Sequence, residues 1–217
     1  MYYIIGDIHG MLGKLLKLYD QIKGMITEND TLIFLGDYID RGPSSYEVVE
    51  FLITLSKTRK TVFLKGNHED MLLNYLAGKD HTDIYLYNGG DATLRSYERN
   101  TRYAGIPEKH MKFFKSLHLY FETDDFIAVH AGINPAYERV AEQPEDDTLW
   151  IRDAFFRSPK RWPKLIVFGH TPTVYISHEF GSVFIDHERN IIGIDTGAVY
   201  GGYLSCLRIP DRLIIQC

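Results

Sequence analysis

Residues 31–42 read TLIFLGDYIDRG and combine an apolar run with a cluster of charged side chains. The apolar half has the composition of a buried strand, and Asp37, Asp40 and Arg41 follow it within a few positions. Two carboxylates this close repel each other unless a cation lies between or beside them. Asp after a strand is, however, often only a turn former. Taken alone, the stretch therefore leaves a turn and a cation site as equal alternatives.

Four further apolar runs end in the same way, with Asp, Asn or His next to Gly. They are residues 1–5 before GDIHG, 61–64 before KGNHE, 126–129 before HAG and 165–168 before GHT. Loops at the ends of strands are held in place by the sheet and commonly carry functional groups. The recurrence predicts one site built at the ends of several strands.

The composition is that of a globular protein, with 45% hydrophobic and 24% charged residues. A length of 217 residues predicts a single domain covering residues 1–217. The net charge of −5 argues against a nucleic-acid partner, and no apolar run is long enough to span a membrane. Two cysteines and an N-terminus without a leader pattern favour a reducing, cytoplasmic compartment.

The first third of the chain alternates strands with amphipathic helices. Leucines and other apolar residues at helical spacing predict a helix over 12–22, and Pro43 opens a second one that extends to about residue 55. Strand, helix and strand in this order predict a parallel sheet with its functional loops at the carboxyl ends. Residues 69–122 are mainly helical in character. Within them, the Gly-rich stretch 85–91 is better interpreted as a helix connector than as a phosphate cradle, because no Lys-Ser/Thr follows it.

The last third has two features. Residues 134–148 are acidic and predict an irregular loop, either solvated or lining the rim of a cleft. Beyond residue 165, short alternating runs predict a second, mostly antiparallel sheet. The runs are 174–177, 182–185, 191–194, 203–209 and 212–216.

The strand ends supply six side chains that can bind metal ions: Asp7, His9, Asp37, Asn67, His130 and His170. Carboxylate, imidazole and amide ligands together suit manganese, iron or zinc better than magnesium or calcium. Six ligands are too many for one tetrahedral ion and fit two, with Asp37 as the natural bridge. Two such ions can share a hydroxide and bind the oxygens of a phosphoryl group.

Four other residues complete this chemistry. Arg41 and Arg152 offer guanidinium groups that match phosphate oxygens. Asp40 and His68 form an acid pair if they are not ligands, because the carboxylate orients the imidazole and favours its protonated form. The protonated imidazole can then protonate the leaving oxygen.

The motifs GDIHG, GDYIDRG, GNHE, HAG and GHT, in this order, resemble the phosphoprotein phosphatase family of the calcineurin-like metallophosphoesterases. The resemblance spans nearly the whole chain and implies a four-layer α/β/β/α sandwich of two mixed sheets. It implies that Asp7 and His9 bind the first metal ion, that Asp37 bridges, and that the second ion is held by Asn67, His130 and His170. It also implies that His68 is the general acid with Asp40 as its partner, and that Arg41 and Arg152 bind phosphate.

Two details refine the resemblance. His130 is followed by Ala-Gly, which points to the bacterial and phage branch, and Asp195 lies in a strand-end motif of that branch as a supporting residue. We expect a manganese-dependent monomer that hydrolyses phosphoserine and phosphothreonine in proteins, or small phosphoesters, because the compact length resembles the small protein phosphatases. The alternative substrate is diadenosine tetraphosphate. An inactive binding module is disfavoured, because no ligand position is lost.

Overall fold

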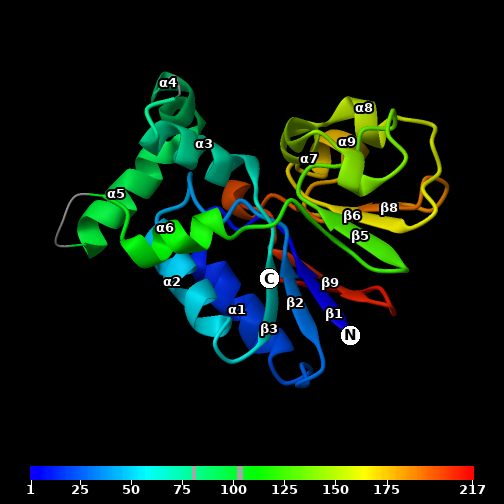
Figure 1. Cartoon of the computed structure of the whole chain (residues 1–217). Helices are drawn as coiled ribbons and strands as arrows, with labels where there is room; N and C mark the ends of the chain where they lie inside the picture. The colour runs from blue at the N-terminus through cyan, green and yellow to red at the C-terminus, as the bar shows by residue number, and fades with distance from the viewer. Residues whose placement is uncertain (80–81, 102–104) are drawn as a thin grey trace.

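Two sheets pack face to face between two sets of helices, as Figure 1 shows. The computed structural model describes residues 1–79, 82–101 and 105–217, and within these each sheet has five strands. The first sheet has the order β10-β9-β1-β2-β3 and the second the order β4-β5-β6-β8-β7. The strands of the first sheet are β1 (Tyr2–Ile5), β2 (Thr31–Phe34), β3 (Lys60–Phe63), β9 (Ser205–Ile209) and β10 (Leu213–Gln216). Those of the second are β4 (Tyr120–Glu122), β5 (Phe126–Val129), β6 (Leu165–Phe168), β7 (Phe184–Asp186) and β8 (Ile191–Gly193).

The register of the first sheet brings three motif-bearing loops to one edge. Strands β1, β2 and β3 are parallel, with Ile5 paired with Phe34 and Phe34 paired with Phe63. Each strand therefore ends at the same level, and GDIHG, GDYIDRG and GNHE leave the sheet side by side. In the second sheet, β5, β6 and β8 are parallel, and β4 and β7 are antiparallel edge strands.

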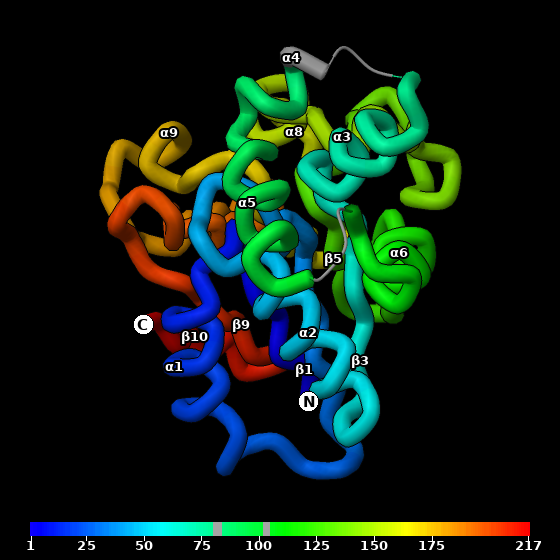
Figure 2. Tube along the Cα trace, turned by 90° about the vertical axis from the view of Figure 1, so that its left-hand side faces the viewer, coloured from blue at the N-terminus to red at the C-terminus, as the bar shows by residue number. Residues whose placement is uncertain are grey.

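Helices cover the outer face of each sheet (Figures 1 and 2). The first sheet carries α1 (Leu12–Ile22) and α2 (Ser45–Leu55), and the helical segment that follows contains α3 (Asn67–Leu76), α4 (Thr82–Tyr85), α5 (Asp91–Asn100) and α6 (Glu108–Lys115). The second sheet carries the short helices α7 (Glu145–Trp150), α8 (Asp153–Phe156) and α9 (Val174–Ser177).

Three apolar clusters fill the spaces between these layers. The cluster between the sheets joins residues of both, such as Ile4, Ile33, Val167 and Ile192. The other two lie between each sheet and its own helices. This arrangement confirms the expected four-layer sandwich of two mixed sheets.

The predicted second sheet was wrong in two respects. Residues 174–177 form the helical turn α9 instead of a strand, because Thr173 donates its backbone N–H to Asp195 and starts a turn there. Tertiary contacts here override the β propensity of a Val-Tyr-Ile run. The C-terminal hairpin β9–β10 pairs with β1 and so completes the first sheet, which leaves the second sheet mixed and not mostly antiparallel.

Two loop predictions had different outcomes. The acidic loop 134–148 is partly helical, because α7 begins at Glu145 with three acidic residues in its first turn, where the helix dipole favours them. The Gly-rich stretch is a helix connector, as expected. Residues Leu86–Gly90 form a π-helical turn between α4 and α5, with Gly89 at φ 95°. Within the described part of the chain, no helix is long and apolar enough to cross a membrane.

Candidate metal centre

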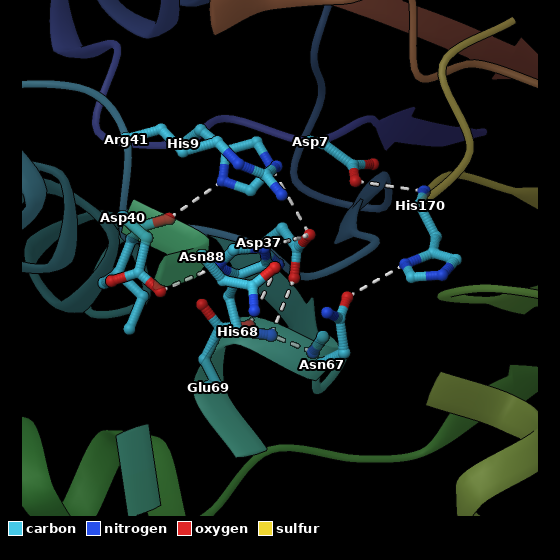
Figure 3. Close-up of polar contacts among 12 residues, drawn as sticks. Asp7, His9, Asp37, Asp40, Arg41, Asn67, His68, Glu69, Asn88 and His170 are labelled. Atoms are coloured by element: carbon cyan, nitrogen blue, oxygen red, sulfur yellow. Dashed lines mark hydrogen bonds and ion pairs between the residues drawn. The ribbon is translucent and has the colours of Figure 1, made fainter. Parts of the chain in front are cut away.

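The strand-end loops converge on Asp37, which lies at the centre of Figure 3. Asp7 and His9 follow β1, and Asp37 follows β2. Asn67 and His68 open helix α3, so the GNHE motif lies on a helical turn and not on a loop. His130 and His170 follow β5 and β6 of the other sheet. The structure thus brings together all six predicted ligands, and each of their side chains is buried.

Several of these residues have strained backbone conformations. The φ angle is 46° at His9, 50° at Asp37 and 63° at His170, and it is also positive at Asp40 and Arg41. A left-handed conformation at a residue other than Gly costs about 1–3 kcal/mol and persists only where the surroundings enforce it. Such strain is typical of functional sites, where it aims side chains that an ordinary turn would point elsewhere.

The buried carboxylate of Glu69 enforces the conformation at Asp37. It accepts hydrogen bonds from the backbone N–H groups of Asp37 at 2.9 Å, Tyr38 at 2.8 Å and Gly66 at 3.0 Å. Burial and the charge of Asp37 raise the pKa of Glu69 to about 8. Glu69 lies within the GNHE motif, but no role was predicted for it from the sequence. Its position three residues after Gly66, where a capping glutamate sits, was the available signal.

Two sets of ligand atoms share Asp37. In one set the ligand atoms of His9, Asp37 and His68 lie within 4.8 Å of one another, and in the other those of Asp37, His130 and His170 do. Asp37 Oδ2 is 3.4 Å from His9 Nε2, and Asp37 Oδ1 is 3.5 Å from His130 Nε2. One carboxylate therefore faces both sets, which is the position that a bridging ligand needs.

The remaining two predicted ligands border these sets. The Oδ1 atom of Asn67 lies 2.8 Å from His170 Nδ1 and 3.0 Å from His130 Nε2. Asp7 accepts the backbone N–H of His170 at 3.0 Å through Oδ2. Asp7 belongs to neither set. In the set with His9 and Asp37, the third member is His68 and not Asp7 as predicted.

The protonation pattern suits divalent cations. His130 Nδ1 lies 2.9 Å from the Leu35 carbonyl and must donate to it, so Nε2 presents a lone pair to the Asn67 oxygen, another acceptor. His9 Nδ1 likewise donates to the Ile39 carbonyl, and the guanidinium of Arg41 approaches its Nε2. Burial lowers the pKa of both imidazoles and keeps them neutral, as metal ligands must be.

Unpaired buried atoms and an excess of buried carboxyl groups also favour bound cations. Asp7 Oδ1 and His170 Nε2 are buried without a hydrogen-bond partner. Burial, together with the charges of Asp195 and Asp37, raises the pKa of Asp7 well above its ordinary value. Burial also raises the pKa of Asp195 to about 6. Three buried carboxyl groups this close require positive charge, so the residues present fit two divalent ions.

The predicted contact between His68 and Asp40 is present. His68 Nδ1 lies 2.7 Å from Asp40 Oδ2. The other oxygen of Asp40 accepts hydrogen bonds from Tyr85 at 3.0 Å and Thr93 at 2.6 Å. Both partners come from the helical segment that follows α3, and neither was predicted from the sequence. Because all three contacts are buried, Asp40 is fixed and holds the ring of His68 in one orientation.

The two arginines flank the two ligand sets. Arg41 contacts His9 of one set, and its backbone N–H donates to Gly89, whose missing side chain lets the connector lie against Arg41. Arg152 donates to the Thr171 hydroxyl at 3.0 Å, next to His170 of the other set. Both arginine side chains are exposed. This is the placement expected of two groups that receive a phosphate from solvent.

Residues 2–201 match the calcineurin-like phosphoesterase family. The chain belongs to this family. Enzymes of this family use a dinuclear centre of divalent metal ions, which the His and Asp groups around Asp37 could hold.

Similar proteins differ in the substrates that their names give. The asymmetrical bis(5'-nucleosyl)-tetraphosphatase PrpE of Anoxybacillus flavithermus is 32% identical, over 97% of this chain and 91% of its own. The crystal structure of a candidate diadenosine tetraphosphatase is 25% identical, with a TM-score of 0.75 over 100% of this chain and 92% of that one. A protein serine/threonine phosphatase from Saccharomyces cerevisiae, at 17% identity and a TM-score of 0.61 over 99% of this chain and 78% of that one, shares the fold. The narrower assignment to the phosphoprotein phosphatases is thus not supported.

We expect Glu69→Ala to weaken metal binding, although Glu69 is not one of the proposed metal ligands. The change leaves three buried N–H groups without an acceptor and releases the strained turn at Asp37. The free energy of unfolding should fall by about 2–4 kcal/mol, measured by urea denaturation. The affinity for Mn²⁺, measured by calorimetry, should fall about 10–100-fold, as for other residues that orient ligands.

Glu145→Ala is the matched control, because Glu145 makes an exposed ion pair with Lys65. It should change stability by less than about 1 kcal/mol and leave Mn²⁺ binding intact. Wild-type affinity for Mn²⁺ in Glu69→Ala would show that the turn does not depend on this carboxylate.

Proposed function

We propose that this chain hydrolyses dinucleoside polyphosphates, with diadenosine tetraphosphate as the representative substrate. The observation that carries the proposal is the 32% identity to a bis(5'-nucleosyl)-tetraphosphatase that extends over nearly all of both chains. The compact length does not favour a protein phosphatase, because this relative is nearly as compact. Length was the observation that favoured phosphoproteins in the sequence analysis, and it does not separate the two substrates.

Each residue of the site has a role in this reaction. Asp7, His9, Asp37, Asn67, His130 and His170 would hold two divalent ions, for which we propose manganese, with iron or zinc as alternatives. When bound, the ions act as Lewis acids on the phosphoryl oxygens. Arg41 and Arg152 bind the remaining phosphate oxygens, and their exposure lets a long polyphosphate reach them.

The acid pair acts at the leaving oxygen. His68 is held by Asp40 through Nδ1, so Nε2 faces the ligand set, 3.9 Å from Asp37 Oδ2. A proton on Nε2 is then placed for transfer to the oxygen that departs from phosphorus. Asp40 keeps the ring in position throughout, since its other oxygen is fixed by Tyr85 and Thr93.

A second candidate function, hydrolysis of phosphoserine and phosphothreonine, is favoured by this same pair. A serine or threonine alkoxide is a poor leaving group and needs the proton as it departs. A nucleotide phosphate, whose second pKa is about 6, needs it much less. The proposed acid is therefore needed less for the leading substrate than for a phosphoprotein, and a direct comparison of substrates tests the two functions.

The comparison uses the manganese-loaded enzyme with diadenosine tetraphosphate and with a phosphothreonine peptide. We expect kcat/KM to be at least about tenfold higher for the dinucleotide, a difference of about 1.4 kcal/mol. Unequal cleavage should give AMP and ATP, separated by anion exchange. Asp37→Asn, prepared in parallel, should be inactive and so exclude a contaminant. Faster turnover of the peptide would make the protein phosphatase assignment the correct one.

We predict that His68→Asn lowers turnover of an alkyl phosphate ester about 10²–10⁴-fold, the usual share of general-acid catalysis. The loss should be much smaller for para-nitrophenyl phosphate, whose leaving group hardly needs a proton. Asp40→Asn should show the same dependence on the leaving group, and the exposed His118→Asn should show no loss. An equal defect for both esters would remove the acid role and leave His68 as a ligand.

A further inference from the structure

A pocket lined by aromatic rings adjoins the metal centre. It has a volume of about 160 Å³, and its walls include Pro172, Thr173, Tyr175, Phe180, Gly197 and Tyr200. Two of its walls continue directly from site residues, since Pro172 follows the loop of His170 and Gly197 follows that of Asp195. The pocket and the metal centre are therefore built on the same loops.

The pocket combines exposed rings with a lack of charge. Tyr175 is 69% exposed, Phe180 60% and Tyr200 54%. Single exposed apolar residues are ordinary, but several gathered in one concave site mark a place where a ligand binds. Every residue that lines the pocket is uncharged, so the pocket suits a neutral, flat, apolar group.

The pocket also contains a polar group that lacks a partner. Thr173 is completely buried, and its hydroxyl oxygen makes no hydrogen bond within the protein. Buried hydroxyl groups are normally paired. A ligand with a ring nitrogen or an amino group can supply the missing partner.

Tyr200 connects the pocket to the phosphate-binding residues. The guanidinium carbon of Arg41 lies 5.6 Å from the centre of the Tyr200 ring. Arg41 in turn contacts His9 of the metal centre. If the ring of a ligand lies in the pocket, the part of that ligand just outside the pocket therefore lies beside Arg41.

The loops that carry the rings are held rigidly. Lys14 donates to the carbonyl of Ala198 at 2.7 Å and also to that of Gly202, on either side of Tyr200. Gln216 of β10 donates to the carbonyl of Gly181 at 2.9 Å, next to Phe180. Because α1 and the C-terminal strand anchor these loops, the pocket is formed before a ligand arrives.

We propose that this pocket binds one purine base of a dinucleoside polyphosphate, with the phosphates leading past Tyr200 to Arg41 and the metal centre. The proposal rests on the proposed function. The volume is below the roughly 300 Å³ of a pocket that encloses a whole drug-sized ligand, and so suits one ring system. Aromatic side chains stack on bases, and the Thr173 hydroxyl adds one hydrogen bond to the base edge.

The test compares Tyr175→Ala and Phe180→Ala with the wild type on two substrates. For diadenosine tetraphosphate we expect kcat/KM to fall about tenfold or more in each variant, mainly through KM, because stacking on the base is lost. For para-nitrophenyl phosphate, which has no purine, kcat/KM should stay within about twofold. Because both rings are largely exposed, their truncation should not unfold the protein, which circular dichroism checks.

Two control variants test whether the effect depends on an aromatic ring in the pocket. Tyr175→Phe keeps the ring and should retain activity toward the dinucleotide. Tyr87→Ala removes a ring that is 92% exposed and lies outside the pocket, and kcat/KM should stay unchanged for both substrates.

A second readout does not depend on turnover of the dinucleotide. AMP and ribose 5-phosphate share a phosphate and a ribose, and only AMP has a base. With para-nitrophenyl phosphate as the substrate, AMP should inhibit the wild type at least about tenfold more strongly than ribose 5-phosphate. In Tyr175→Ala the two inhibitors should become nearly equal.

These outcomes separate this inference from the proposed function. A wild type that does not hydrolyse diadenosine tetraphosphate contradicts the function, and the AMP comparison still tests the pocket. A wild type that does hydrolyse it, with variants that lose both substrates equally or neither, contradicts the pocket and leaves the function intact. Equal inhibition by AMP and ribose 5-phosphate in the wild type also overturns the assignment.

Discussion

The rest of the site depends on three hydrogen bonds to the carboxylate of Glu69. They tie the turn after β2 to the start of α3, through the N–H groups of Asp37, Tyr38 and Gly66. These bonds hold Asp37 in its left-handed conformation, in which Oδ2 lies 3.4 Å from His9 Nε2 and Oδ1 lies 3.5 Å from His130 Nε2. The parallel register of β1, β2 and β3 brings the loops together, and Glu69 orients the loop after β2, which carries Asp37.

The sequence predicted the part of the site that lies directly at strand ends. All six proposed ligands and the pair His68–Asp40 follow short apolar runs, so their clustering required parallel strands within each sheet and two sheets packed with these strand ends together. The partners of Asp40 could not be found in this way. Tyr85 and Thr93 lie in the helical segment beyond α3, and their approach to Asp40 is decided by how that segment packs, which local patterns do not encode.

The wrong fold predictions also arise because tertiary packing is not encoded in local patterns. The runs that became α9 and the β9–β10 hairpin have the composition of strands, but tertiary contacts decide whether such a run forms a strand and which sheet it joins. The comparisons support the alternative substrate better than the main prediction, for a different reason. The motifs specify phosphoester chemistry, which many members of a family share, whereas the substrate is selected by surfaces around the site. The aromatic pocket, which we propose as one such surface, takes its rings from Tyr175, Phe180 and Tyr200, which lie beyond the motif residues of their loops.

The central claim is that one carboxylate, Asp37, joins two metal positions. Its most direct test is a crystal grown with Mn²⁺ and measured near the manganese absorption edge. We expect two anomalous peaks about 3.5–4 Å apart, as in other two-metal sites, one beside His9 and the other beside His130 and His170, with Asp37 in contact with both. A single peak, or peaks that Asp37 does not join, would contradict the account.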